Sequence, residues 1–229
     1  VHKLDQILGT SPLPEPQNPK TPHGNQVELD HVSFTYPGAS HPALNDVTFQ
    51  VSEGETVALV GPSGGGKTTA ASLIPRFWDV QTGQVRIGGV DVRELSTQEL
   101  MKKVAFVFQD THLFKTSLLE NIRAARPDAT REQVLQAAKA AQCGDILQKF
   151  PQGLDTQVGS KGVYLSGGEQ QRIALARAIL KDAPIVVLDE ATAFADPENE
   201  ILIQKAFETL TKGKTVLMTP SCKKNNNNN

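Results

Sequence analysis

The sequence is poor in cysteine and in aromatic residues, and it has no long hydrophobic run. Its 229 residues include 2 Cys, 9 Phe, 2 Tyr and 1 Trp. Cys143 and Cys222 have neither metal-binding nor redox spacing, which favours a reducing compartment. No apolar stretch approaches the ~20 residues that span a bilayer, and residues 1–8 lack the apolar core of a signal peptide.

An excess of basic charge is also absent. The net charge of −2 offers no general basic surface to nucleic acid. The 5 His are scattered and form no ligand pair on one helical face, so they assign no metal. With 38% hydrophobic residues, the chain can bury a full core and form two lobes. Composition therefore predicts a soluble cytosolic domain with no nucleic-acid partner.

A glycine-rich loop at residues 61–68 is the most informative segment. It reads Gly-Pro-Ser-Gly-Gly-Gly-Lys-Thr, follows a strand-like run at 57–60 and precedes a helical segment. Such a turn directs backbone N–H groups and the positive end of a helix dipole at phosphates. Lys67 is then expected to reach the β- and γ-phosphates, and Thr68 to offer its hydroxyl to Mg²⁺. A purely structural glycine turn is the weaker alternative.

Two adjacent carboxylates follow a second buried strand. Residues 185–188 form a short, mostly β-branched apolar run, typical of a central parallel strand, and Asp189 and Glu190 come directly after it. Nucleotide sites lie at the carboxyl ends of parallel strands, which favours a functional pair over a plain strand end. Asp189 is expected to hold Mg²⁺ through its water shell.

The segment Leu-Ser-Gly-Gly-Glu at 165–169 completes the pattern. This segment is expected to start a helix. Like the glycine-rich loop, it would then form a helix N-terminus suited to an anion. In this order and spacing the motifs resemble the nucleotide-binding domain of an ATP-binding cassette (ABC) transporter, and the resemblance runs from about Val27 to Met218. It implies an α/β fold with a P-loop NTPase (RecA-like) core, an antiparallel β subdomain and a helical subdomain.

The resemblance also implies residue roles. The implied catalytic residues are Glu190, Lys67 and Gln109. Glu190 would act as general base on the attacking water. Gln109 would sense Mg²⁺ and the γ-phosphate. Tyr36, 25 residues before the glycine-rich loop, would stack on adenine, and Asp196 would contact a paired cassette. The implied ATP-binding set is Tyr36, Gly61, Pro62, Ser63, Gly64, Gly65, Gly66, Lys67, Thr68, Thr69, Ser166, Gly167, Gly168 and Glu169, and the implied metal set is Thr68, Gln109 and Asp189.

Some of these residues have structural alternatives. Tyr36 could be a half-buried packing residue, and Asp196 would also cap the helix that Pro197 begins. Four apolar residues of the helical lobe face either a partner helix or the core of the lobe itself: Phe114, Leu118, Leu119 and Ile122.

The chain divides into three parts. Residues 1–26 include a proline-rich stretch, predicted to be an extended linker from an upstream, absent membrane domain. Residues 27–219 form the nucleotide-binding domain, with the helical subdomain at about 112–180. Capping boxes at 96–99 and 130–133 each start a helix, and the second opens an Ala-rich segment that ends at Pro151.

The tail departs from the family. After a strand at 215–218 the family places a histidine that contacts the γ-phosphate, and Ser221 stands about there. Residues 220–229 are irregular and end in five asparagines, so we expect a truncated or unassigned tail. This leaves hydrolysis by the chain as written open, while ATP binding need not be affected.

The function implied is that of an ATPase motor. Two cassettes would close around two ATP and Mg²⁺, as a homo- or heterodimer, and drive a membrane domain on the same polypeptide, at the cytoplasmic face of a bacterial inner membrane. Residues 116–122 and 155–162 resemble exporter-type cassettes, although Ser160 replaces a common acidic residue. The alternatives are a non-transport ABC ATPase, or a binding module that closes on ATP without turnover. Substrate and direction are not encoded here.

Overall fold

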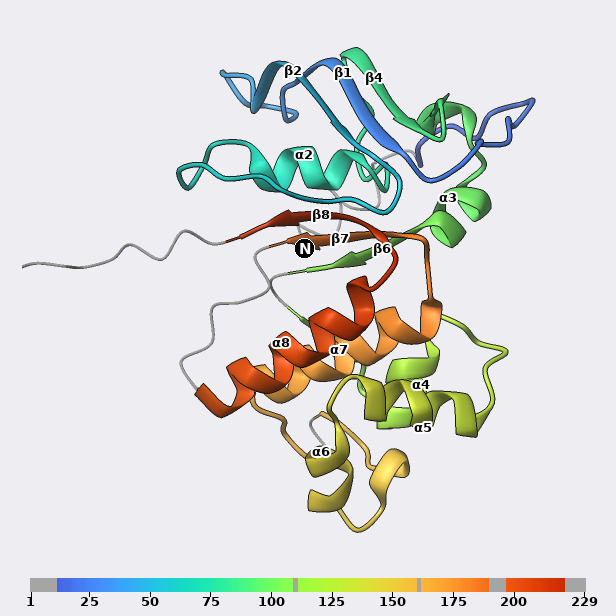
Figure 1. Cartoon of the computed structure of the whole chain (residues 1–229), viewed down its shortest axis with the longest axis vertical. Coiled ribbons are helices and arrows are strands. Elements are labelled where there is room, and N and C mark those ends of the chain that lie inside the picture. The colour runs from blue at the N-terminus through green and yellow to red at the C-terminus, as the bar shows by residue number, and fades with distance from the viewer. Residues whose placement is uncertain (1–11, 109–110, 160–161, 190–196, 221–229) are drawn as a thin grey trace, which may run out of the picture.

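The computed structural model describes residues 12–108, 111–159, 162–189 and 197–220 (Figure 1). Two four-stranded sheets organise this part of the chain. Gln109, Glu190 and Asp196 lie outside the described residues, as do Ser160 and Ser221.

The first sheet is antiparallel throughout. Its strands, in spatial order, are β2 (Leu44–Val51), β1 (Val27–Phe34), β4 (Thr82–Ile87) and β5 (Val90–Asp91). Strand β1 alternates between buried and more exposed residues over much of its length, which is the pattern of a sheet with one face on the core.

The second sheet is parallel. Its strands, in order, are β3 (Thr56–Ala58), β8 (Thr215–Thr219), β7 (Ile185–Asp189) and β6 (Val104–Val107). All five residues of β7 are buried, as expected of a central strand covered on both faces. Because the strands are parallel, their carboxyl ends meet at one edge, and the segments that follow them start there.

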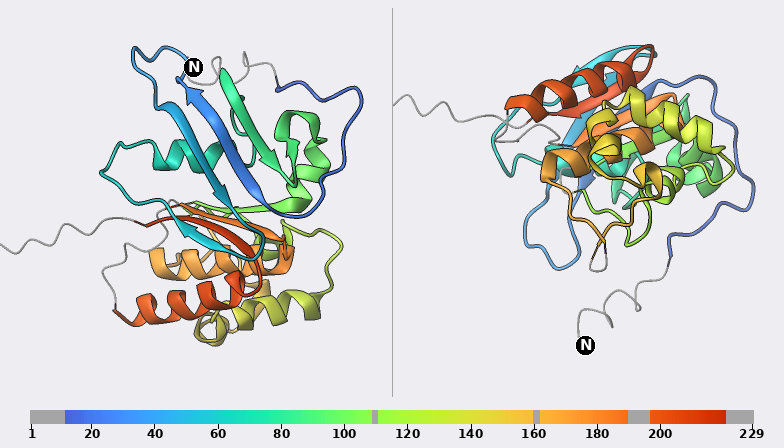
Figure 2. Two further views of the ribbon diagram at one scale, coloured as in Figure 1. Left: turned by 45° about the horizontal axis from the view of Figure 1, so that its top comes forward. Right: turned by 90° about the horizontal axis from the view of Figure 1, so that it is seen from below.

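Helices cover both faces of the parallel sheet (Figures 1 and 2). Helix α2 (Lys67–Leu73) lies between the two sheets, and its apolar side joins the core that the sheets share. The opposite face carries α7 (Gly167–Lys181) and α8 (Pro197–Thr211), with α4 (Leu118–Arg123), α5 (Arg131–Ala140) and α6 (Gly144–Lys149) beyond them. The remaining elements are α3 (Thr97–Lys103) and the short 3₁₀ helices η1 (Val92–Glu94) and η2 (Gly153–Asp155).

One predicted helix is wrong in its extent. The capping box at Thr130 is present, with reciprocal hydrogen bonds between Thr130 and Gln133. The expected continuation to Pro151 is broken, however, because α5 ends at Ala140 and α6 begins at Gly144. Gln142 between them adopts φ 60°, in the left-handed region that a continuous α-helix does not enter.

The proline-rich stretch at 12–26 forms neither helix nor regular strand over most of its length and is attached to the domain. Lys20 N donates to the Glu94 carbonyl at 2.8 Å, and Arg76 Nη2 donates to the Pro14 carbonyl at 3.0 Å. Across the described ranges, no helix combines the length and the apolar character that crossing a membrane requires.

Candidate functional site

The glycine-rich loop joins the parallel sheet to helix α2. Gly66 is the N-cap of α2 and has φ 82°, which favours glycine. A Cβ there would lie 2.5 Å from the carbonyl oxygen of Ala43, so no other residue fits without moving the backbone. The loop therefore delivers the chain into α2 in one defined geometry.

Lys67 folds back over this loop. Its Nζ donates to the carbonyl oxygens of Gly61 at 2.9 Å and Pro62 at 2.8 Å. The ammonium thus lies against the loop that leads into α2, and a helix N-terminus favours anions. Phosphate oxygens can replace the two carbonyl acceptors without any change in the lysine's charge.

Three oxygen-bearing side chains converge at the edge of the parallel sheet. Asp189, at the end of β7, is only 6% exposed. Its Oδ1 accepts from Thr68 Oγ1 at 3.0 Å and from Thr219 Oγ1 at 2.7 Å. Mg²⁺ prefers hard oxygen ligands, so Thr68 and Asp189 fit that ion chemically.

Thr219 is a site residue that sequence reasoning missed. It ends β8, and Asp189 and Thr219 are direct partners in the β7–β8 ladder. The register of two strands 30 residues apart places them together. A parallel pairing of residues 185–188 with 215–218, both predicted as strands, would have been the signal.

Tyr36 has the contacts of a packing residue in this structure. Its ring centre lies 4.9 Å from that of Phe34 and 5.5 Å from that of Trp78, edge-on to both. Its hydroxyl shares a 2.9 Å hydrogen bond with Thr69 Oγ1. The packing alternative describes these contacts, and stacking on adenine stays a prediction.

The segment at 165–169 starts helix α7 with a capping box. Ser166 Oγ accepts from Glu169 N at 3.2 Å, and Glu169 Oε2 accepts from Ser166 N at 2.9 Å. Lys149 donates to the other carboxylate oxygen of Glu169 at 3.0 Å. A Cβ on Gly168 would lie 2.6 Å from Asn199 Cγ, so glycine lets α8 approach this turn. Ser166 and Gly167 remain exposed, whereas Glu169 is committed to the cap.

The two anion-type helix starts lie on opposite faces of the parallel sheet. Helix α2 packs in the core between the sheets, and α7 packs in the core of the helical side (Figure 1). The predicted ATP-binding residues therefore form two groups in one chain, one at 61–69 with Tyr36, which hydrogen-bonds to Thr69, and one at 166–169.

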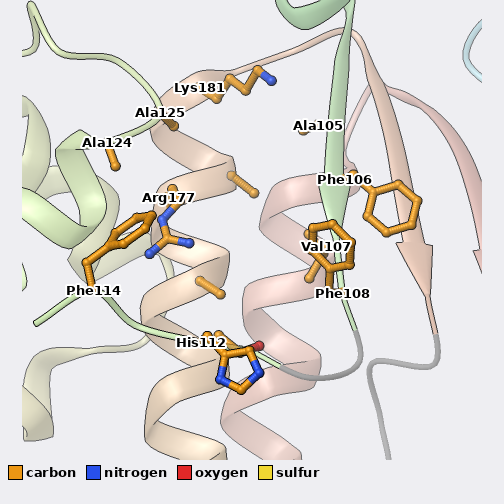
Figure 3. A pocket seen from close by; sticks show the side chains of 13 residues that line it. Ala105, Phe106, Val107, Phe108, His112, Phe114, Ala124, Ala125, Arg177 and Lys181 are labelled. Atoms are coloured by element: carbon orange, nitrogen blue, oxygen red, sulfur yellow. The ribbon is translucent and has the colours of Figure 1, made fainter. Parts of the chain in front are cut away.

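A groove of about 570 Å³ lies beside the edge strand β6 (Figure 3). Phe106 and Phe108 line it from the β6 side, and Arg177 and Lys181 line it from α7. Burial lowers the pKa of both Arg177 and Lys181. The Arg177 guanidinium lies 5.3 Å from the ring centre of Phe114.

The apolar residues of the helical lobe divide between core and surface. Leu118 and Ile122 are fully buried, and Leu119 is partly buried against the same core. Phe114 is 57% exposed and lines the groove. Leu118, Leu119 and Ile122 therefore belong to the core of the helical lobe, and of the four residues only Phe114 faces outward.

The chain matches known proteins along most of its length. A family profile described as ABC transporter matches residues 44–193. A protein of Bacillus subtilis (strain 168), YgaD, named as a candidate multidrug export ATP-binding/permease protein, is 48% identical over 192 residues, which are 84% of this chain and 33% of that protein. A protein of Staphylococcus aureus (strain NCTC 8325 / PS 47) with the same kind of name is 46% identical over 193 residues, again 84% of this chain and 33% of that protein. The chain thus spans about a third of the length of these curated relatives.

A solved structure supports the same assignment. The structure of a bacterial Atm1-family ABC exporter with ATP bound matches with a TM-score of 0.85 and 34% identity, over 96% of this chain and 39% of that chain. These matches confirm the predicted fold class, a P-loop NTPase core with an antiparallel sheet and a helical part.

Proposed function

The chain belongs to the ABC transporter family, and from that premise we propose that it is the ATP-binding and ATP-hydrolysing motor domain of an ABC transporter. The observation that carries the proposal is the convergence of Thr68, Asp189 and Thr219 beside the glycine-rich loop. A loop suited to phosphates and a carboxylate suited to a hard cation therefore lie at the same edge of the parallel sheet. We assign this motor to residues 27–219, with residues 1–26 as the linker to a membrane domain.

In this account the chain's own residues bind and orient the nucleotide. Lys67 exchanges its two carbonyl acceptors for phosphate oxygens, and the start of α2 adds its dipole. Thr68 and Asp189 hold Mg²⁺, which when bound neutralises charge on the phosphates. Glu190, which follows Asp189 in the sequence, takes a proton from the attacking water, and Gln109, two residues after the end of β6 in the sequence, senses Mg²⁺ and the γ-phosphate.

A second cassette completes each site. Because α2 and α7 lie on opposite faces of the parallel sheet, the loop of one chain and Ser166 of another can face each other across a head-to-tail dimer. Two ATP molecules then sit in two composite sites, in a homo- or heterodimer. Binding closes the dimer, and charge repulsion after hydrolysis reopens it. Asp196 contacts the partner in this arrangement.

A membrane domain on the same polypeptide receives this motion. The relatives combine ATP-binding and permease parts in their names, and the chain spans a third of their length. The groove lined by Phe106, Phe108 and Phe114 supports an apolar partner, since exposed aromatic clusters mark contact surfaces. We place the motor in an exporter at the cytoplasmic face of a bacterial inner membrane.

Calorimetric titration of nucleotide tests the proposal. We expect MgATP to bind one per chain and adenosine, which has no phosphates, not to bind measurably. In Asp189→Asn the affinity for ATP should lose its dependence on Mg²⁺, because the charge that holds the ion is removed. Equal binding of adenosine and ATP would contradict a phosphate site.

Phosphate release in the same samples separates the motor from a module that closes on ATP without turnover. Release that disappears in Glu190→Gln supports the motor. MgATP binding with no release supports the module.

A further inference from the structure

The carboxylate of Glu169 has both of its oxygens engaged at the start of helix α7. Its Oε2 accepts from Ser166 N at 2.9 Å, within the cap, and its Oε1 accepts from Lys149 Nζ at 3.0 Å. The Glu169 side chain is only 12% exposed, whereas that of Lys149 is 51% exposed. A nearly buried negative charge in the cap is therefore balanced by a lysine from another helix, α6.

The place of this charge matters for an anion. Glu169 is the third residue of α7, about 4.5 Å along the helix axis from the exposed cap residue Ser166. The carboxylate stabilises the helix, because a helix N-terminus favours negative charge. For the same reason it competes with a phosphate there. Two like unit charges 4 Å apart repel, even in bulk water, by an amount worth roughly a fivefold change in affinity.

Lys149 is well placed to offset this repulsion. It is the last residue of α6, where the helix dipole favours a cation, and its Nζ lies 5.4 Å from the ring centre of Phe150. Arg172, the next cation along α7, is paired with Asp145 instead. Within the described ranges, Lys149 is thus the cation whose ion pair balances Glu169.

We propose that Lys149 is a positioning residue of the half-site at 166–169, an inference that rests on the proposed function. By neutralising Glu169, it lets the start of α7 accept the phosphates bound to the partner's loop. The ion pair also keeps the Glu169 carboxylate on Ser166 N, where it completes the cap. Lys149 itself contacts no nucleotide in this account, so its effect is on closure of the dimer and not on ATP binding by the loop at 61–69.

Light scattering against MgATP concentration, in a Glu190→Gln parent, tests this role. In Lys149→Met the charge of Glu169 is no longer balanced, so the MgATP concentration for half-dimerisation should rise roughly three- to tenfold. Glu169→Gln retains a capping side chain but removes the carboxylate, so this concentration should fall below that of the parent. The double variant carries neither charge and should dimerise close to the parent.

A merely structural ion pair predicts a different order of the variants. If the pair only fastened α6 to α7, Lys149→Met and Glu169→Gln would each break it and would weaken dimerisation alike. Salt gives a second readout. The difference between Lys149→Met and the parent should shrink from about 0.1 M to about 1 M NaCl, because the Debye length falls from about 10 Å to about 3 Å.

Two controls accompany these measurements. Lys139→Met, at an exposed lysine of α5, removes the same charge elsewhere on the helical side and should match the parent. At chain concentrations too low for dimerisation, Lys149→Met should bind MgATP as the parent does. Weaker binding by this monomer would assign Lys149 to the nucleotide of its own loop and overturn the inference.

The outcomes separate this inference from the proposed function. A parent that dimerises with MgATP while Lys149→Met behaves identically overturns the role of Lys149 alone. Equal weakening in Lys149→Met and Glu169→Gln has the same consequence. A parent that stays monomeric with bound MgATP overturns the dimer and this role with it.

Discussion

In the proposed motor, phosphate binding depends on Lys67, whose side chain makes two hydrogen bonds in this structure. Both acceptors are carbonyl groups of its own loop, and the side chain is half-buried. Exposed or part-buried hydrogen bonds of this kind contribute little to folding, about 1 kcal/mol each. We therefore expect Lys67 to contribute more to ligand binding than to the stability of the fold.

Lys67→Ala should abolish measurable ATP binding while changing the free energy of unfolding by no more than about 1–2 kcal/mol. Calorimetric titration and urea denaturation measure the two effects separately. Lys102→Ala, an exposed lysine of α3, is the control and should alter neither. Loss of stability in proportion to the loss of binding would show that Lys67 has a structural role instead.

Arg172, in contrast to Lys67, is expected to contribute mainly to the stability of the fold. It is 1% exposed, and its guanidinium donates to Asp145, the Gln142 carbonyl and Asn199. It joins the break between α5 and α6 to the start of α8. Arg172→Met should lower the free energy of unfolding by about 3 kcal/mol, because it removes the hydrogen bonds of a guanidinium that is itself almost fully buried, at about 1 kcal/mol each.

The partner carboxylate gives a dependence on pH. The Arg172 guanidinium holds the pKa of Asp145 below its usual range. Because the pKa of Asp145 is lower in the folded state, the ion pair stabilises the protein at pH values above the pKa of an unfolded Asp, about 3.9. This stabilisation is lost as the pH falls through the pKa of the folded state. Because the Asp145 side chain is 56% exposed, Asp145→Asn should cost less than about 1 kcal/mol at pH 7. Denaturation at pH 7 and pH 3 should show this difference shrinking, and a difference independent of pH would contradict the ion pair.

At the scale of elements, local sequence patterns predict the bounds of the strands, but not the features that depend on tertiary contacts. Strand β1 has the bounds that its sequence pattern predicts, and β7 and β8 each extend only one residue further. The sequence marks the break at Gln142 only by Gly144, the first residue of α6, and the turn itself depends on a tertiary hydrogen bond from Arg172 to the Gln142 carbonyl. The contact of Thr219 with Asp189 depends on strand register, which single-strand patterns do not contain.

The capping boxes that start α7 and α5 allow a matched experiment. Ser166 and Thr130 each cap a helix with the same reciprocal geometry, and both are exposed. Ser166→Ala and Thr130→Ala should each cost about 1 kcal/mol of stability in urea denaturation. In the Glu190→Gln background only Ser166→Ala should weaken ATP-driven dimerisation as well, because Ser166 faces the partner's nucleotide in the proposed dimer. Equal effects of both variants on dimerisation would reduce the role of Ser166 to capping.

At the scale of the whole molecule, the arrangement of layers separates the two halves of the site. The motifs themselves were predictable from sequence, because each has a local chemical reason. The family resemblance implies that they lie on opposite faces of the domain, and the structure has the helices that follow them, α2 and α7, on opposite faces of the parallel sheet (Figure 2). A single chain therefore offers two half-sites, and the account requires a second copy or a related chain to complete them.

The most direct test of this claim is the solution mass of the Glu190→Gln chain by light scattering, with and without MgATP. Removing the proposed general base, Glu190, should trap the nucleotide-bound state. The account predicts a monomer without nucleotide and a doubled mass with MgATP. A monomer under both conditions, with MgATP binding confirmed in the same sample, would contradict the composite site.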